Sequence, residues 1–299
     1  MSSTNQNNRD RNFFALLSNQ WKIANSLVCI GLDTDYKLIP DAIKKRKGSK
    51  RTNKTDSIFA FNKEIIDSTA EFVCCFKLQI AFYSAEGNAG LVALRKTINY
   101  LNKGYPYIPI ILDAKRGDIG TTAEKYATEL FDIFNADAVT LNPYLGREAY
   151  LSFLSLANKG LFFLCHTSNP GAGEFQELLV NNEEKPEGYS SLHLFEQIAQ
   201  NIASKWNVNN NCGLVIGATF PEQLSRVRQL VGDMTFLIPG IGAQGGDIEK
   251  TVQAGVNSHG TGMIISSSRS IIYASDQTNF EIAARKQVIK LNEDINRFR

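Results

Sequence analysis

The chain has 299 residues, of which 43% are hydrophobic and 21% are charged, and its 32 basic and 30 acidic residues give a formal net charge of +2. These values are typical of a soluble globular protein with a sizeable core, and the absence of any run of about 18 apolar residues excludes a membrane-spanning helix. The length suggests about two domains, but a single α/β barrel of roughly 250 residues is an exception to that rule.

The N-terminal segment, residues 1–24, begins with MSSTNQNNRDRN and lacks the apolar stretch of a secretory signal. The five cysteines lie in short apolar runs without the spacing of a metal site: Cys29, Cys74, Cys75, Cys165 and Cys212. We therefore predict buried, reduced thiols in a cytoplasmic protein that has no membrane partner.

Residues 44–54 read KKRKGSKRTNK and hold seven basic residues but no acidic one. Without them, 25 basic residues remain against 30 acidic ones, so the rest of the surface offers no general attraction for nucleic acid. We interpret this run as a solvated loop, with a localisation or polyanion-binding patch as the alternative.

Apolar runs of strand length alternate along the chain with segments of helical period, as in β/α units that build a parallel sheet. Eight strands are predicted, at 27–33, 73–80, 109–115, 138–142, 161–166, 213–217, 236–241 and 262–266. Eight helices are predicted, at 56–71, 88–103, 122–135, 147–158, 191–206, 221–231, 247–254 and 279–298. This pattern predicts one (β/α)8 (TIM) barrel domain over residues 25–299.

Local signals add detail to this plan. Thr121 and Glu124 in TTAE have the spacing of a capping box, which places the third strand-to-helix loop at 116–120. Two insertions interrupt the barrel, one near 44–54 and one at 171–189. The second is too long for an ordinary connection, so it is either a lid over the barrel mouth or has no function.

Charged residues gather where the predicted strands end, which is where this fold places its active sites. Asp33 ends the first strand, Lys77 lies in the second, and Asp113, Lys115 and Asp118 end the third in IILDAKRGD. Alternation along a strand puts Asp113 and Lys115 on the same side, toward the mouth. The glycine before Asp118 allows the chain to turn this carboxylate back toward Lys115.

This alternating Lys, Asp, Lys, Asp array has two interpretations. It could be a salt-bridge network that holds the barrel top, with Asp118 capping the following helix. Buried ion pairs stabilise little because desolvation offsets their attraction, so four charges at a barrel mouth favour a catalytic site.

A second group of residues follows the seventh and eighth predicted strands. PGIGAQGGD exposes backbone N–H groups, and SSSRSIIYA places a cation among hydroxyls. Loops at these positions usually hold a phosphate in this fold. Gln244 and Arg269 are therefore the predicted phosphate ligands.

DAKRGDIGTTAEKYA resembles the signature of the orotidine 5'-monophosphate decarboxylase family, and PGIGAQGGD with SSSRSIIYA resembles its phosphate-binding loops. The resemblance extends from about Asn25 to the C-terminus. HTSNPGAGEFQ and the chain length are most similar to the longer, second bacterial-type group, in its stand-alone form. The resemblance implies decarboxylation of orotidine 5'-monophosphate to uridine 5'-monophosphate, the last step of de novo pyrimidine biosynthesis, with no metal and no organic cofactor.

The resemblance also implies roles for single residues. Lys115 would donate the proton, Asp113 would face the substrate carboxylate, and Lys77 would bridge Asp113 and the ribose hydroxyls. Asp33 would contact the ribose.

Three further contacts follow from the same resemblance. Asp118 and Thr122 would come from the second subunit of a homodimer, so that the active sites are shared. Ser168 would contact the pyrimidine, with Thr167 as the alternative. The resemblance assigns no role to His259, which is expected to be an ordinary histidine on the surface or in the core.

Two other functions remain alternatives. A magnesium-dependent sugar-phosphate decarboxylase or aldolase of the same barrel superfamily carries a similar strand, but it needs an acidic ligand where this chain has Lys77. A non-catalytic phosphate-binding barrel would use Gln244 and Arg269 but gain nothing from Lys115 between two acids. A nucleic-acid binder using the basic run ranks last.

Overall fold

The computed structural model describes residues 11–44, 53–181, 191–242 and 245–299, and eight parallel strands form a closed barrel within it. The strands are β1 (Val28–Gly31), β2 (Cys75–Gln79), β3 (Ile110–Arg116), β4 (Ala138–Leu141), β5 (Gly160–His166), β8 (Cys212–Ile216), β9 (Phe236–Pro239) and β10 (Met263–Ser267). Their order around the barrel is β1-β10-β9-β8-β5-β4-β3-β2. All eight predicted strands and the predicted fold are confirmed.

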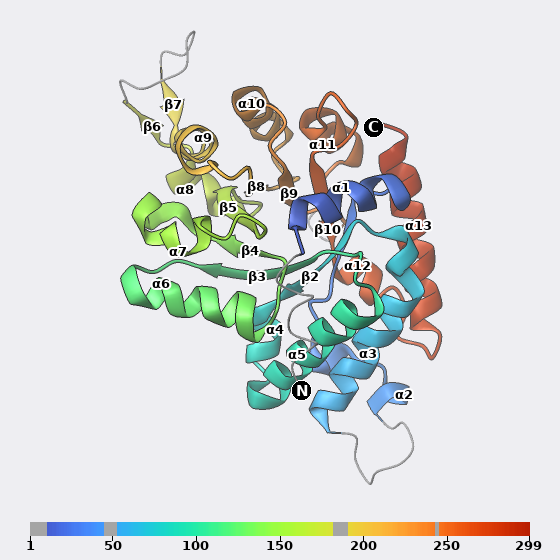
Figure 1. Ribbon diagram of the computed structural model, residues 1–299. Helices are drawn as coiled ribbons and strands as arrows, with labels where there is room; N and C mark the ends of the chain where they lie inside the picture. Colours follow the sequence, from blue (N-terminus) through green and yellow to red (C-terminus); the bar gives the residue numbers. More distant parts are fainter. Residues whose placement is uncertain (1–10, 45–52, 182–190, 243–244) are drawn as a thin grey trace.

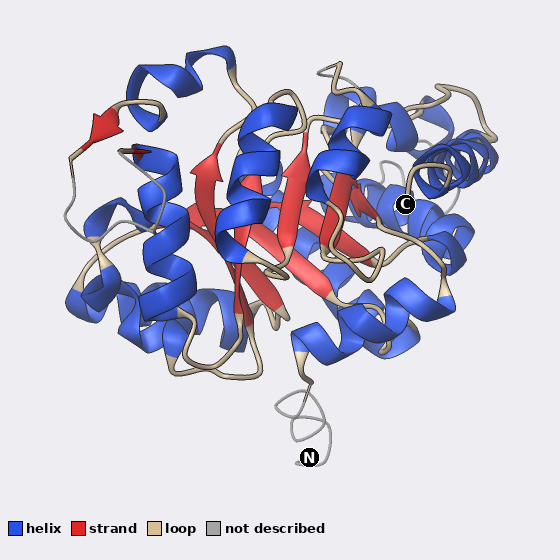
Figure 2. Cartoon of the chain, turned by 90° about the horizontal axis from the view of Figure 1, so that it is seen from above, coloured by secondary structure: helices blue, strands red, loops and turns tan. Residues whose placement is uncertain are grey.

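Helices surround this barrel, as Figures 1 and 2 show. The predicted helices correspond to α3 (Lys54–Thr69), α5 (Gly87–Gly104), α6 (Gly120–Ala127) with the π-helix η3 (Thr128–Ile133), η5 (Arg147–Tyr150) with α7 (Leu151–Leu154), α9 (Leu194–Asn201) with the π-helix η7 (Ile202–Trp206), α10 (Pro221–Val231), α11 (Ile248–Gly255) and α13 (Phe280–Asn296). The last helix packs against α3, which closes the ring.

Short elements connect these units. They are η1 (Tyr36–Leu38), α2 (Asp41–Lys44), η2 (Ala70–Phe72), α4 (Ile80–Ser84), η4 (Pro143–Leu145), η6 (Pro170–Ala172), α8 (Gly173–Gln176), β6 (Leu179–Val180), β7 (Leu192–His193) and α12 (Arg269–Ile272). Strands β6 and β7 form a small antiparallel pair that projects from the barrel (Figure 1).

Local sequence explains several helix boundaries. Pro221 occupies the first position of α10, where a missing N–H costs nothing, and Gly232 follows the helix with φ +60°. The predicted capping box at Thr121 is wrong. Helix α6 already begins at Gly120, so Thr121 lies within the first turn, and its N-cap Ile119 makes no side-chain cap bond.

Helix α1 (Phe13–Ile23) lies in the N-terminal segment, where no element was predicted, and it covers the N-terminal end of the barrel. Phe13 packs edge-on against Phe162 of β5, and Trp21 donates its indole N–H to the carbonyl of Met263 at 3.1 Å. Burying a large apolar side chain such as Phe13 contributes roughly 1.5–3 kcal/mol. A β-carbon on Gly160 would lie 2.5 Å from the Phe13 ring, so a glycine is required for this approach.

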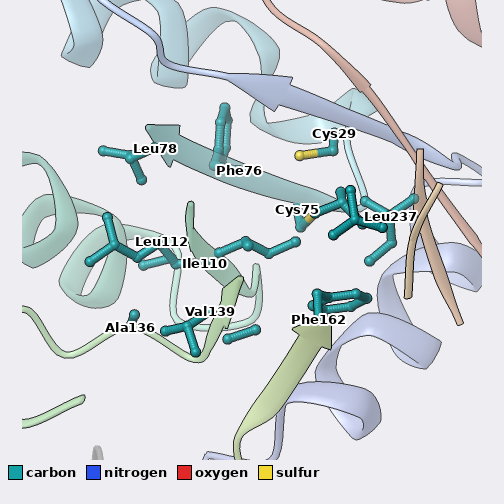
Figure 3. Packing of buried hydrophobic residues seen from close by; sticks show 14 of the residues in the cluster. Cys29, Cys75, Phe76, Leu78, Ile110, Leu112, Ala136, Val139, Phe162 and Leu237 are labelled. Atoms are coloured by element: carbon teal, nitrogen blue, oxygen red, sulfur yellow. The ribbon is translucent and has the colours of Figure 1, made fainter. Parts of the chain in front are cut away.

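The inward side chains form a layered core below the barrel mouth. Cys29, Cys75, Phe162 and Leu237 lie close together in Figure 3 and are buried. All five cysteines are free and buried, as predicted. The polar residues of the barrel mouth lie directly above this apolar layer.

Candidate active site

A cavity of about 560 Å³ opens at the C-terminal ends of the barrel strands. Its size lies within the range of small-molecule sites. Of the residues that the sequence analysis singled out, its lining includes Asp33, Lys77, Asp113, Lys115, Thr167, Ser168 and Arg269. The structure therefore brings three of the four charges of the predicted array, with Asp33 and one half of the predicted phosphate site, into one cavity, whereas Asp118 does not line it.

Four of these side chains form a continuous chain of alternating charge. The Lys77 ammonium lies 3.3 Å from Asp33 Oδ1 and 3.4 Å from Asp113 Oδ2. The Lys115 ammonium lies 2.6 Å from Asp113 Oδ1. Asp113 and Lys77 are almost completely buried, whereas the Lys115 side chain remains 44% exposed and reaches into the cavity.

The neighbouring charges keep the buried members of this chain ionised. Burial alone would raise the pKa of Asp113, but Lys77 and Lys115 hold that pKa below its ordinary value. Burial likewise opposes the charge of Lys77, yet Asp33 and Asp113 raise the pKa of Lys77 above its ordinary value. The cavity thus contains a fixed carboxylate beside an accessible ammonium.

The backbone that carries Asp113 and Lys115 is not a regular strand. Register with β4 shifts between Leu112 and Arg116, which pair with Val139 and Leu141, and Lys115 has φ +49°. Both side chains point to the mouth, as alternation predicted, but a β-bulge sets their final approach.

Two polar residues of this site were missed in the sequence. Thr140 of β4 donates to Asp113 Oδ1 at 2.7 Å, and Gln79 of β2 donates to Asp113 Oδ2 at 2.9 Å. Gln79 could have been found, because it is two residues beyond Lys77 and so shares its side of the strand. Thr140 is a single hydroxyl in the apolar run AVTL, which is a weaker signal.

The structure does not bring Asp118 to Lys115 within one chain. Among the described residues, Lys115 forms an ion pair only with Asp113, while Asp118 Oδ1 accepts from the adjacent Ile119 amide at 2.8 Å. The predicted turn toward Lys115 is therefore wrong for a single chain. Neither Asp118 nor Thr122, which is exposed on α6, lines the cavity.

Exposed apolar side chains lie on α6 and the elements next to it, and one of them, Ile119, follows Asp118 directly in the chain. Ile119 is 61% exposed, Tyr144 88% and Leu151 50%, and they lie on elements that neighbour one another around α6. We call these residues and Leu145, which is 40% exposed, the α6 patch. A cluster of this kind is a candidate contact surface for another protein.

The loop after β5 distinguishes Thr167 from Ser168. The Thr167 hydroxyl donates to Asn169 Oδ1 at 2.7 Å and accepts from Gln176 at 2.8 Å, so it is already engaged. In the described part of the chain, no partner bonds to the Ser168 hydroxyl, and a β-carbon on Gly217 would come within 2.6 Å of the Ser168 backbone. Ser168 is therefore the available hydroxyl.

The loops after β9 and β10 meet on the opposite side of the cavity. Gly242 has φ +89°, and a β-carbon there would lie 2.9 Å from Ser270 Oγ, so only glycine allows this contact. Arg269 begins α12, is exposed, and lines the cavity together with Ser268 and Gly240. Gln244 lies outside the described residues.

Three further sequence predictions concern parts of the chain outside this cavity. His259 is exposed in the loop before β10, at the other end of the barrel, which fits the expectation of a surface residue. No group of three His, Cys, Asp or Glu side chains in the described ranges is arranged to hold a metal ion. A search of the same residues finds no helix with the length and apolarity needed to span a membrane.

Comparisons with known proteins agree with the fold and the site. The model of the orotidine 5'-phosphate decarboxylase / HUMPS family matches residues 26–281. An orotidine 5'-phosphate decarboxylase of Cellvibrio japonicus is 48% identical over 284 residues, which are 95% of this chain and 98% of that protein.

Solved structures give the same result. The OMP decarboxylase of Leishmania donovani is 33% identical, with a TM-score of 0.76 over 95% of this chain and 99% of that one. The UMP synthase of the same organism is 36% identical with a TM-score of 0.81; the match covers 96% of this chain and 56% of the synthase.

Proposed function

The chain belongs to the orotidine 5'-phosphate decarboxylase / HUMPS family, and we infer that it converts orotidine 5'-monophosphate to uridine 5'-monophosphate and CO2. The observation that carries this inference is the Lys115 ammonium, which reaches into the cavity 2.6 Å from the buried Asp113 carboxylate. The reaction needs a cation where negative charge develops, and this geometry supplies one.

Charge determines the chemistry of this site. When the bond from C6 of the pyrimidine to the carboxylate breaks, its electron pair stays on C6 as a carbanion with little resonance stabilisation. Lys115 stabilises this charge and then donates its proton to C6, and solvent returns the proton to Lys115. Fixed charges in a water-poor cavity perform this task without reorganisation.

Asp113 and Lys77 complete the reacting end. Asp113 faces the carboxylate that leaves, and its repulsion ends once neutral CO2 has formed. Lys77 holds Asp113 on one side and extends its charge toward Asp33 on the other. We assign both Lys77 and Asp33 to the ribose hydroxyls.

The remaining substrate groups are assigned to the opposite wall. Ser168 contacts the pyrimidine, and Arg269 with Gln244 binds the phosphate. Binding energy from a phosphate remote from C6 is then available to orient the reacting group and lower the barrier.

The α6 patch supports a homodimer. Asp118 directly precedes Ile119, a member of this cluster of exposed apolar side chains, and such clusters mark contact surfaces. We assign Asp118 and Thr122 to the active site of the second subunit. The buried free cysteines support a reducing, cytoplasmic location.

The magnesium-dependent alternative is not favoured. Its strand-2 acidic ligand would have to occupy the position of Lys77, whose ammonium lies between Asp33 and Asp113 and would repel the ion. A non-catalytic phosphate-binding barrel would not require the buried carboxylate beside Lys115.

The decisive experiment is decarboxylation by the purified protein, followed as loss of orotidine 5'-monophosphate absorbance, with wild type and Lys115→Ala compared. We expect Lys115→Ala to bind uridine 5'-monophosphate but to lose more than about 1,000-fold in kcat, because it lacks both the cation and the proton donor. Retention of most of the wild-type rate would reject Lys115 as the proton donor. Lys103→Ala, an exposed lysine at the end of α5 and outside the cavity, is the control.

A further inference from the structure

The Thr140 hydroxyl makes three hydrogen bonds to the segment that carries the catalytic pair. Its oxygen accepts from the amides of Ala114 and Lys115, both at 3.0 Å, and its proton is donated to Asp113 Oδ1 at 2.7 Å. A threonine hydroxyl has one donor and two acceptor sites, so every site is used. Thr140 is only 1% exposed, so water does not compete for these hydrogen bonds.

These bonds replace part of the β3–β4 ladder. Leu112 pairs with Val139 and Arg116 pairs with Leu141, so three residues of β3 lie opposite Thr140 alone. A backbone cannot pair three residues with one, and the Thr140 oxygen receives two of the amides in this bulge. Lys115, in the middle of the arrangement, has φ +49°, which is uncommon for a residue with a side chain.

From this geometry we propose that Thr140 is a positioning residue for decarboxylation, an inference that rests on the proposed function. Its hydroxyl holds the Lys115 backbone in the bulge and fixes Asp113 Oδ1, the oxygen that also accepts from the Lys115 ammonium at 2.6 Å. Thr140 therefore acts on both partners of the pair at once. It does so through Asp113 and Lys115, without donating a proton to substrate.

Valine has the shape of threonine but would place a methyl group against two amides and a carboxylate. Losing the donor also removes a hydrogen bond to the ionised form of Asp113. Because burial already disfavours that ionised form, the carboxylate becomes easier to protonate. Serine keeps the hydroxyl and loses only a methyl group. The chain thus offers a matched set: Thr140→Val, Thr140→Ser and Thr140→Ala.

We expect Thr140→Val to reduce kcat by about 10- to 100-fold while KM changes less, because the phosphate end is untouched. The acid limb of the kcat–pH profile should move to higher pH, since Asp113 loses a hydrogen bond to its ionised form and becomes easier to protonate. Thr140→Ser should stay within about threefold of wild type in kcat and keep its pH profile. Thr69→Val, a buried threonine of α3 outside the cavity, controls for placing valine in the interior.

Folding is checked by circular dichroism and by uridine 5'-monophosphate affinity. If Thr140→Val does not fold, the comparison of Thr140→Ser with Thr140→Ala isolates the hydroxyl, and a rate loss only in alanine supports the proposal. A folded Thr140→Val with wild-type kcat and pH profile would overturn it.

Lys115→Ala, measured in parallel, separates this proposal from the proposed function. An inactive Lys115→Ala beside an unaffected Thr140→Val rejects the role of Thr140 alone. An active Lys115→Ala rejects the catalytic pair, and the positioning role of Thr140 falls with it.

Discussion

Asp113 is a buried carboxylate that four neighbouring side chains keep ionised. Its two oxygens accept from Lys77, Gln79, Lys115 and Thr140, so a carboxylate that burial would neutralise is held ionised. Buried ion pairs of this kind add little stability, because desolvation offsets their attraction. Removing one partner would nevertheless leave an uncompensated charge, which costs about 3–5 kcal/mol. The array is therefore better explained by chemistry than by stability.

Arg269 differs from these residues, because no acidic side chain in the described part of the chain neutralises its charge. It is exposed at the cavity rim and pairs with no acidic side chain among the described residues. Arg269→Ala should lower kcat/KM for orotidine 5'-monophosphate by about 100-fold, since charge-assisted bonds to phosphate are lost. The nucleoside without phosphate should lose little.

Comparing the substrate with and without its phosphate tests whether Arg269 binds that group. Equal losses with and without phosphate would show that Arg269 does not bind that group. Arg297→Ala, an exposed arginine near the C-terminus, controls for the loss of a positive charge.

The sequence was sufficient to predict the charged residues of the site, because charged residues are rare in buried strands. Asp33, Lys77, Asp113 and Lys115 could be found because charges are costly inside a barrel, and the structure places all four in contact. Thr140 could not be found, because a threonine in a strand is ordinary and its role depends on a bulge in its neighbour. The predicted turn at Asp118 was wrong for a single chain, because the Asp118 carboxylate accepts from the Ile119 amide at 2.8 Å while Lys115 pairs with Asp113.

At the scale of elements, the chain after β5 is tied to the barrel by side chains. Glu177, just after α8, lies 2.9 Å from the ring of His166 at the end of β5, and Gln176 accepts from the Thr167 amide at 2.8 Å. The described part of the predicted insertion therefore borders the cavity, which favours a lid over a segment without function. Residues 182–190 of that insertion lie outside the described residues.

His166 makes this connection sensitive to pH. Burial lowers the pKa of His166 below its ordinary value, although Glu177 opposes the shift. Near and below pH 6.5 the unfolded chain takes up a proton that the folded chain refuses, so the free energy of unfolding falls as the pH drops. Above that range the contribution is constant. We expect the melting temperature to decrease between pH 7.5 and pH 5.5.

Replacing the imidazole tests this sign. His166→Gln keeps a polar partner for Glu177 but does not titrate, so the decrease in melting temperature between the two pH values should become smaller. His259→Gln, which removes the exposed histidine, should keep the wild-type decrease. A wild-type melting temperature that rises on acidification would contradict the assigned shift.

At the scale of the whole molecule, hydrophobic periodicity was sufficient for the barrel. Each of the eight strands is a short apolar run between helical segments, and closure needs only that repeat. The pattern did not reveal α1, because its residues cover the barrel from below and belong to no β/α unit. The packing of Phe13 against Gly160 at the bottom of the barrel is a tertiary contact between distant parts of the sequence. Local sequence patterns do not predict such contacts.

The assembly proposed from the α6 patch can be tested through the active site itself. If Asp118 acts in the partner's site, Lys115→Ala and Asp118→Ala are each inactive as homodimers but complement one another after subunit exchange. In a mixed dimer one site carries both defects, and the other combines an intact Lys115 with an intact Asp118. Random exchange of equal amounts makes half of the dimers mixed, so roughly a quarter of wild-type activity should return.

A second mixture makes this result specific to Asp118. Lys115 and Arg269 line the same cavity of one chain, so in dimers of Lys115→Ala with Arg269→Ala every site carries one defect, and the mixture should not exceed the mean activity of the two unmixed variants. Native mass measurement verifies exchange in both mixtures. If exchange is complete and the Asp118 mixture stays inactive, Asp118 does not cross between subunits, and the α6 patch must serve another contact. Recovery in the Asp118 mixture alone would place the patch at a two-fold interface, because only a partner's chain can return the missing carboxylate to the cavity.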